Sequence, residues 1–118
     1  MFVEQAVKAC LRRESANGFL YELGDDFPAF KGHFEKHPLL PAVCQLSFCS
    51  DAASRLLKTP VELKAVKRAK FINPVFPGAQ LEVSFSLRPD GWYFAELTEL
   101  KQRKKISQII LQFTRSAQ

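Results

Sequence analysis

The chain has 118 residues, of which 47% are apolar and 25% charged; this composition excludes a disordered or low-complexity protein and predicts one domain, residues 1–118. Its 17 Lys and Arg outnumber 12 Asp and Glu, and the net charge of +5 favours an acidic partner. No apolar run approaches the ~20 residues of a membrane helix, and charged residues interrupt the N-terminal stretch where a signal peptide needs its apolar segment, so we expect a cytoplasmic protein without membrane insertion.

The N-terminal half is predicted to hold one long helix. Residues 2–11 fit either a helix or a short strand, and both interpretations stay open. Alternation over residues 19–23 predicts a strand, and residues 25–41, with three prolines, predict a long ordered loop. From Pro41, which suits the first position of a helix, residues 42–58 predict a helix that is buried on most sides. The apolar positions on one side of that helix are Val43, Leu46, Cys49, Ala53 and Leu56 or Leu57.

The C-terminal half is predicted to form four antiparallel strands. Alternating apolar residues predict strands over residues 63–72, 81–87, 92–98 and 106–113, and Arg88-Pro89-Asp90-Gly91 is typical of a hairpin turn. In the first of these strands, Leu63, Ala65, Ala69 and Phe71 are predicted to face one way. One helix with an antiparallel sheet is an α+β plan, and a sheet that wraps the helix gives the hotdog architecture.

The cysteines indicate neither a metal site nor a redox centre. Cys10, Cys44 and Cys49 are odd in number and have no metal-ligand or CxxC spacing. We therefore predict buried, reduced thiols, and the sequence indicates no metal and no cofactor.

The stretch FKGHFEKHPLLPAVCQ, residues 30–45, carries the clearest chemical signal. Gly32 and His33 lie in a proline-bounded loop that leads to the N-terminus of the predicted helix. A helix N-terminus presents unpaired N–H groups that can hold a developing oxyanion, and a nearby histidine can act as a general base near neutral pH. This arrangement suits proton abstraction beside a carbonyl, although a purely structural role for a single loop histidine remains the alternative.

Here the sequence resembles the 3-hydroxyacyl-(acyl-carrier-protein) dehydratases, which are hotdog enzymes of acyl-chain synthesis. The run GHFEKHPLLPAVCQ is similar to the family's GHFP…P.(M/L)PGV…Q signature, and KFINPVFPGAQL, residues 70–81, is similar to its KF..PV.PGDQL segment. The resemblance covers roughly residues 16–116 and extends to short, stand-alone members of specialised acyl clusters. It implies a hotdog fold, with an antiparallel sheet around one long central helix.

The resemblance also implies roles for individual residues. His33 matches the catalytic histidine, which removes the α-proton of a 3-hydroxyacyl thioester. The backbone N–H groups near Ala42 and Val43 match the site that holds the thioester carbonyl, although the family usually has glycine at position 42. The positions implied to bind the thioester substrate are Gly32, Phe34, Pro41, Ala42 and Val43.

The sequence departs from the family at its second catalytic residue. The family carries Asp or Glu fourteen positions after the histidine, and Ser47 stands there in this chain. Loss of a general acid typically lowers the rate by about 10²–10⁴-fold. Asp51, one helical turn after Ser47, and Glu35 are the candidate substitute carboxylates, and a surface role is the alternative for both.

In this family the site lies across a dimer interface, and this leaves two functional hypotheses. One is a dehydratase homodimer with rearranged proton transfer. The other is a non-catalytic acyl-binding subunit or a heterodimer partner, which contributes His33 to a site completed by another chain. A hotdog thioesterase that uses Asp51 is a third alternative, whereas nucleic-acid binding is disfavoured because a recognition helix is lacking.

The expected partners are acyl thioesters, carried by an acidic acyl carrier protein or by coenzyme A. A docking site for the carrier is predicted at Lys67, Arg68 and Lys70 or at Arg12 and Arg13, and ordinary solubilising charge is the alternative. The phenylalanines that are candidates for lining an acyl tunnel are Phe30, Phe34, Phe48, Phe71 and Phe76.

Overall fold

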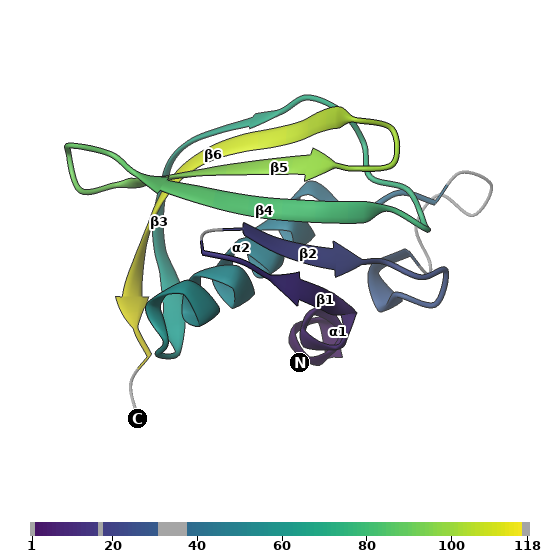
Figure 1. The fold of residues 1–118 in the computed structure, drawn as a ribbon, viewed down its shortest axis with the longest axis horizontal. Coiled ribbons are helices and arrows are strands. Elements are labelled where there is room, and N and C mark those ends of the chain that lie inside the picture. The colour runs from purple at the N-terminus through teal and green to yellow at the C-terminus, as the bar shows by residue number, and fades with distance from the viewer. Residues whose placement is uncertain (1, 17, 31–37, 117–118) are drawn as a thin grey trace.

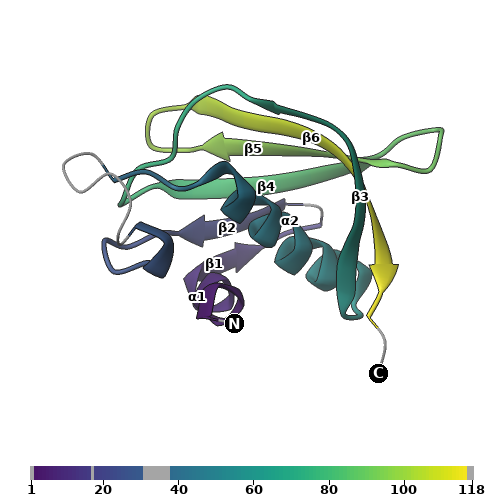
Figure 2. The ribbon, with the colours of Figure 1, turned by 180° about the vertical axis from the view of Figure 1, so that it is seen from behind.

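The computed structural model describes residues 2–16, 18–30 and 38–116. Six antiparallel strands form one sheet in the order β1-β2-β4-β5-β6-β3, and this sheet curves around the long helix α2 (Figures 1 and 2). The elements in chain order are α1 (Phe2–Cys10), β1 (Leu11–Glu14), β2 (Gly18–Glu22), the 3-10 helix η1 (Pro28–Phe30), α2 (Ala42–Leu57), β3 (Val61–Phe71), β4 (Gln80–Leu87), β5 (Tyr93–Glu99) and β6 (Lys104–Arg115).

Most of the predicted elements are confirmed. The four C-terminal strands and the long helix appear within a few residues of the predicted bounds. In the ambiguous stretch 2–11, residues 2–10 form the helix α1, and Leu11 begins the edge strand β1. Within the predicted loop 25–41, residues 28–30 form a short 3-10 helix, because Pro28 is compatible with the first position of a helical turn.

The ends of α2 follow from local sequence. Pro41 has an extended backbone, with φ −57° and ψ 142°, and occupies the cap position instead of the predicted first helical position. Among the side chains of residues 2–16, 18–30 and 38–116, none caps this end of the helix. At the other end Lys58 adopts a left-handed conformation, its N–H donates to the carbonyl of Ser54, and the helix stops before Thr59-Pro60.

The core lies between one face of α2 and the concave face of the sheet. The helix buries Phe48 completely, and the ring packs edge-on against Tyr21 of β2 with 5.0 Å between centroids. Phe27 packs on the same ring at 5.6 Å. Burial of a side chain of this size contributes about 1.5–3 kcal/mol to stability. The sheet residues that line the core include Leu81, Val83, Ala95, Leu97, Ile109 and Leu111.

The predicted burial of α2 on most sides is wrong for this chain. The buried face consists of Gln45, Phe48, Cys49, Ala52 and Ala53. Val43 belongs to the predicted apolar side, yet it is 69% exposed. Of the alternatives Leu56 and Leu57, Leu56 packs against the core and Leu57 is 39% exposed. The reason is geometric: the sheet covers only one side of the helix, and the other side stays open.

The predicted facing of β3 is also partly wrong. Two irregularities, between Leu63 and Ala65 and between Val66 and Arg68, each insert one residue of β3 opposite β6. An inserted residue interrupts the alternation of side chains between the two faces of a strand. Phe71 is therefore 46% exposed, and the tunnel role predicted for it is not supported by its position.

Candidate functional site

The two sequence motifs meet at the N-terminus of α2. The N–H of Leu40 donates to the carbonyl of Val75 at 2.8 Å, and both side chains are buried. Gly78 adopts a φ of +88°, which favours glycine, and its N–H donates to the carbonyl of Leu23 at 2.6 Å. The first bond holds Val75 against the chain that leads into the helix, and the second holds the PGAQ segment against the residue that follows β2.

The implied thioester-binding positions surround this helix end. Pro41 is half-buried, and Ala42 and Val43 are exposed in the first turn. Within the part of the chain that the structure describes, no side chain caps this turn. The N–H of Cys44 donates to the carbonyl of Pro41 at 3.0 Å, so the N–H groups of Ala42 and Val43 are the candidates for holding a ligand oxygen. Gly32, His33, Phe34 and Glu35 lie outside the described residues.

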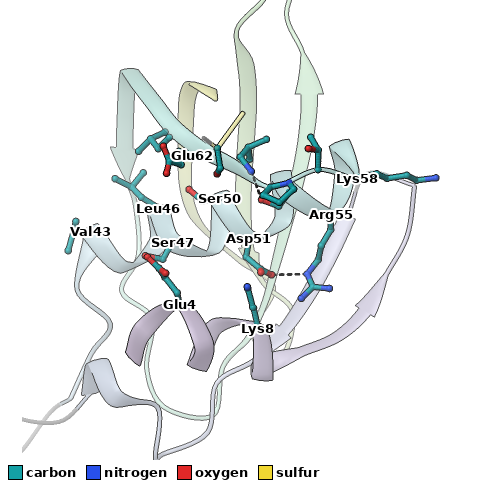
Figure 3. Close-up of a pocket in the computed structure, with 16 residues that line it drawn as sticks. Glu4, Lys8, Val43, Leu46, Ser47, Ser50, Asp51, Arg55, Lys58 and Glu62 are labelled. Atoms are coloured by element: carbon teal, nitrogen blue, oxygen red, sulfur yellow. Dashed lines mark hydrogen bonds and ion pairs between the residues drawn. The ribbon is translucent and has the colours of Figure 1, made fainter. Parts of the chain in front are cut away.

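A groove runs along the open side of α2. Its volume is about 800 Å³, and α1, α2 and the start of β3 form its walls. Ser47 and Asp51 lie on the side of α2 that faces Glu4 and Lys8 of α1 (Figure 3). The remaining lining residues include Val43, Leu46, Ser50, Ser54, Arg55, Lys58, Glu62, Leu63 and Ser116. Ser47 therefore occupies a groove wall with a neutral hydroxyl group.

Asp51 is engaged by two neighbours. Its Oδ2 accepts a hydrogen bond from the Tyr21 hydroxyl at 2.6 Å and another from the Arg55 Nε at 2.8 Å. The Asp51 side chain is only 8% exposed, and Arg55 reaches on to Glu14 of β1 at 3.8 Å. The carboxylate thus ties α2 to β2 and, through Arg55, to β1.

The electrostatics of this cluster keep Tyr21 and Arg55 protonated. Burial, and then the hydrogen bond to Asp51, raise the pKa of Tyr21 far above its ordinary value, so the phenol remains a donor. The hydrogen bond to Asp51 is the main cause that raises the pKa of Arg55. Both neighbours therefore present a donor to the same carboxylate oxygen throughout the neutral pH range.

A buried polar pair links the same helix to the sheet. The hydroxyl of Ser107 on β6 donates to Oε1 of Gln45 on α2 at 2.7 Å, and the two side chains are 0% and 3% exposed. Buried polar groups are costly when unpaired, so this bond fixes the helix against the sheet.

The site residues predicted from the sequence do not include Tyr21, Arg55 or the Gln45–Ser107 pair. The spacing of Asp51 and Arg55, four residues apart in a predicted helix, is a detectable signal for an ion pair. Tyr21 lies thirty positions from Asp51, and only the strand and helix packing brings them together.

The cysteines are free thiols. Cys10 and Cys49 are buried as predicted, and Cys44 is half-buried. Burial raises the pKa of all three, that of Cys49 to about 12. Among residues 2–16, 18–30 and 38–116 no group of three or more potential metal ligands comes together. No helix in that part of the chain has the length and apolar character needed to cross a bilayer.

Comparison with known sequences shows that the chain is similar to dehydratases. The model of the ApeI-like family, described as ApeI dehydratase, matches residues 12–109. The chain is 33% identical over 79 residues to the 3-hydroxyacyl-(acyl-carrier-protein) dehydratase FabZ of Magnetococcus marinus, which covers 57% of this chain and 52% of that protein. The chain thus spans about half the length of the curated relatives it matches.

Solved structures confirm the hotdog fold. The chain is similar to the dehydratase heterocomplex ApeI:P from Xenorhabdus doucetiae, with a TM-score of 0.70 and 21% identity over 89% of this chain and 94% of that one. It is also similar to the PaaI protein of E. coli, with a TM-score of 0.64 and 15% identity over 96% and 89% of the two chains. At these identities the similarity is one of fold.

Proposed function

The chain belongs to the ApeI-like dehydratase family, and we propose that it is the histidine-bearing subunit of a hotdog dehydratase acting on 3-hydroxyacyl thioesters. One observation carries the proposal. Ser47 faces the groove where the resemblance implies a carboxylate, and the nearest carboxylate on the helix, Asp51, already accepts two hydrogen bonds. A chain of this kind is complete only when a second subunit supplies the acid.

The proposed reaction divides between two subunits. His33 removes a proton from C2 of the substrate, and the N–H groups of Ala42 and Val43 hold the negative charge that develops on the thioester oxygen. The C3–O bond breaks, and a carboxylic acid from the partner subunit protonates the leaving hydroxyl. The products are the 2-enoyl thioester and water.

Two observations support the proposed partners. A relative of similar fold is described as a dehydratase heterocomplex, ApeI:P, which is a precedent for paired dehydratase subunits. The net charge of +5 favours an acidic acyl carrier protein as the substrate carrier, with acyl-coenzyme A as the alternative.

The proposal is tested by complementation between two forms of this chain. The wild type is mixed with a His33→Ala/Ser47→Glu variant, which has the acid but lacks the histidine. The mixture is incubated with 3-hydroxyacyl carrier proteins of several chain lengths, at protein concentrations where sedimentation shows dimers. We expect enoyl product, detected by mass spectrometry, to form about 10²–10⁴ times faster than with either chain alone.

A matched control places the acid elsewhere on the groove. Ser50 lines the same groove less than one turn after Ser47, so a His33→Ala/Ser50→Glu variant adds the same charge to the same surface. This control is expected to give no gain. Equal gains from both variants would contradict the proposal, because the position of the acid would then be irrelevant.

A homodimeric dehydratase that uses Asp51 is the second candidate. Asp51 lines the groove, and only its Oδ2 takes part in the bonds to Tyr21 and Arg55. Under this alternative the wild type alone forms enoyl product, and both His33→Ala and Asp51→Asn abolish it. Free acid in place of enoyl product would instead identify a thioesterase.

A further inference from the structure

A second pocket lies apart from the groove that contains Ser47. It opens between the loop that follows β3 and the turn between β5 and β6, at the end of the sheet where β4 begins (Figure 1). The pocket has a volume of about 250 Å³, and it shares no lining residue with the groove. Pockets for drug-sized ligands have volumes of about 300–1,000 Å³, so this one suits a smaller molecule.

Hydrogen bonds fix the walls of this pocket. The carboxylate of Glu99 accepts one bond from the N–H of Gln80 at 2.6 Å and another from the N–H of Gln102 at 2.7 Å, and Glu99 is only 7% exposed. Nδ2 of Asn73, in the loop that follows β3, donates to the carbonyl of Lys105 at 2.8 Å. Walls that are fixed before a ligand arrives lose little conformational freedom when it binds, and this favours affinity.

The turn between β5 and β6 makes the pocket electropositive. Residues 99–105 contain four cations and one carboxylate, that of Glu99. Of the cations, Lys101 and Lys104 line the pocket. The ammonium group of Lys101 donates to the carbonyl of Gly78 at 2.9 Å and keeps two further N–H donors. Among residues 2–16, 18–30 and 38–116 no carboxylate pairs with either lysine, so their charges favour a small anion.

The pocket also has an apolar part. Phe76, Pro77 and Ile106 line it, and Phe76 is 46% exposed. A bare anion would leave the ring of Phe76 in contact with water. An anion with a flat, apolar body would cover that ring and remove its apolar surface from the solvent.

We propose that this pocket binds a small organic phosphate monoester, whose phosphate contacts Lys101 and Lys104 and whose apolar body packs on Phe76. A phosphate monoester carries a charge of about −1.5 to −2 at pH 7 and three strong acceptor oxygens, which match two ammonium groups. A carboxylate has two oxygens and a single charge. The lining of the pocket does not include Ser47 or Ala42. The inference therefore goes beyond the proposed function and does not depend on it.

Phenyl phosphate is a suitable probe, because it joins a phosphate monoester to a flat ring. It is titrated into the full chain, and the backbone amide signals are followed by NMR. We expect saturable shifts in residues 73–79 and 99–105, with an affinity at least about tenfold higher than that of inorganic phosphate, phenol or benzoate. Inorganic phosphate lacks the ring, phenol lacks the charge, and benzoate has a single charge.

Variants test the role of the two lysines. Lys101→Gln/Lys104→Gln should weaken the binding of phenyl phosphate by at least about tenfold. Lys104→Gln alone leaves the bond from Lys101 to Gly78 in place and should weaken binding by about threefold, which separates the loss of charge from a change in the turn. The control Lys8→Gln/Lys58→Gln removes the same charge from the groove and should leave the affinity unchanged.

Three results would overturn the inference. They are the absence of saturable binding at residues 73–79 and 99–105, equal affinities for phenyl phosphate and inorganic phosphate, and equal losses in the control and in the double lysine variant of the pocket. None of the probes is a thioester, so a failure of this inference is distinguishable from a failure of the dehydration assay.

Discussion

Replacing Tyr21 by phenylalanine removes one hydrogen-bond donor from Asp51 and leaves the ring packing intact. The Tyr21 hydroxyl lies 2.6 Å from Oδ2 of Asp51, and its ring packs edge-on against Phe48. A hydrogen bond to a charged group contributes about 1.5–3 kcal/mol. We expect Tyr21→Phe to lower the free energy of unfolding by that amount, or the Tm by about 6–12 °C, taking about 4 °C per kcal/mol for a chain of this length.

The energetic coupling between Tyr21 and Asp51 gives a more specific test than the effect of Tyr21→Phe alone. Asp51→Ala removes the acceptor for both Tyr21 and Arg55, and leaves the buried phenol without a partner. Because each single change disrupts the same bond, the double variant should lose less than the sum of the single losses. The difference should be about 0.5–3 kcal/mol, as found for residues in one hydrogen-bond network.

Urea denaturation followed by the fluorescence of Trp92 supplies these free energies. The single tryptophan of the chain makes the signal easy to assign. The control is Tyr93→Phe, because in the described part of the chain the Tyr93 hydroxyl makes no hydrogen bond, and its loss should change stability by less than about 0.5 kcal/mol. Losses that add within about 0.5 kcal/mol would refute the view that Tyr21 and Asp51 act as one structural unit.

Two further predictions concern buried polar groups. Burial raises the pKa of the Cys49 thiol from 9.0 to about 12. The contribution of Cys49 to the free energy of unfolding is therefore complete below pH 9 and is lost as the pH rises toward 12, at about 1.4 kcal/mol per pH unit. In chemical denaturation at several pH values, a Cys49→Ala variant should lack this pH-dependent loss of stability. Ser107→Ala leaves Oε1 of Gln45 buried without its donor and should lower the free energy of unfolding by about 1–3 kcal/mol, measured by thermal or urea unfolding. The control is Ser86→Ala at an exposed position, which should be nearly neutral. Equal losses of stability in the two variants would contradict the role of the Gln45–Ser107 pair.

Patterns with a short period allowed the elements of the fold to be predicted from sequence. In β4 the apolar residues Leu81, Val83 and Phe85 alternate with polar ones, and all three are buried in the structure. The helix-breaking pair Thr59-Pro60 likewise allowed the end of α2 to be predicted to within one residue. Such signals can be recognised in the sequence because each depends only on residues that are close together along the chain.

The open face of α2 could not be predicted in the same way. Val43 lies in the apolar pattern of the helix but is exposed, while the polar Gln45 is buried. The sequence reports which residues share a helix face, but the face that meets the sheet depends on how far the sheet curves around the helix. Gln45 is accommodated inside only because Ser107 reaches it from β6.

The sequence by itself determined the order of the elements, the two family motifs, the serine at position 47 and the cations between residues 64 and 70. The tertiary structure alone decided two further facts. Asp51 accepts a hydrogen bond from Tyr21 because β2 packs against α2 and brings together two residues that are thirty positions apart in the chain. The cations lie on an edge strand because β6 is the one strand that pairs with β3 in the described sheet. Both facts depend on which segments, distant in the sequence, become neighbours in the fold. A local pattern of residues does not specify these long-range contacts.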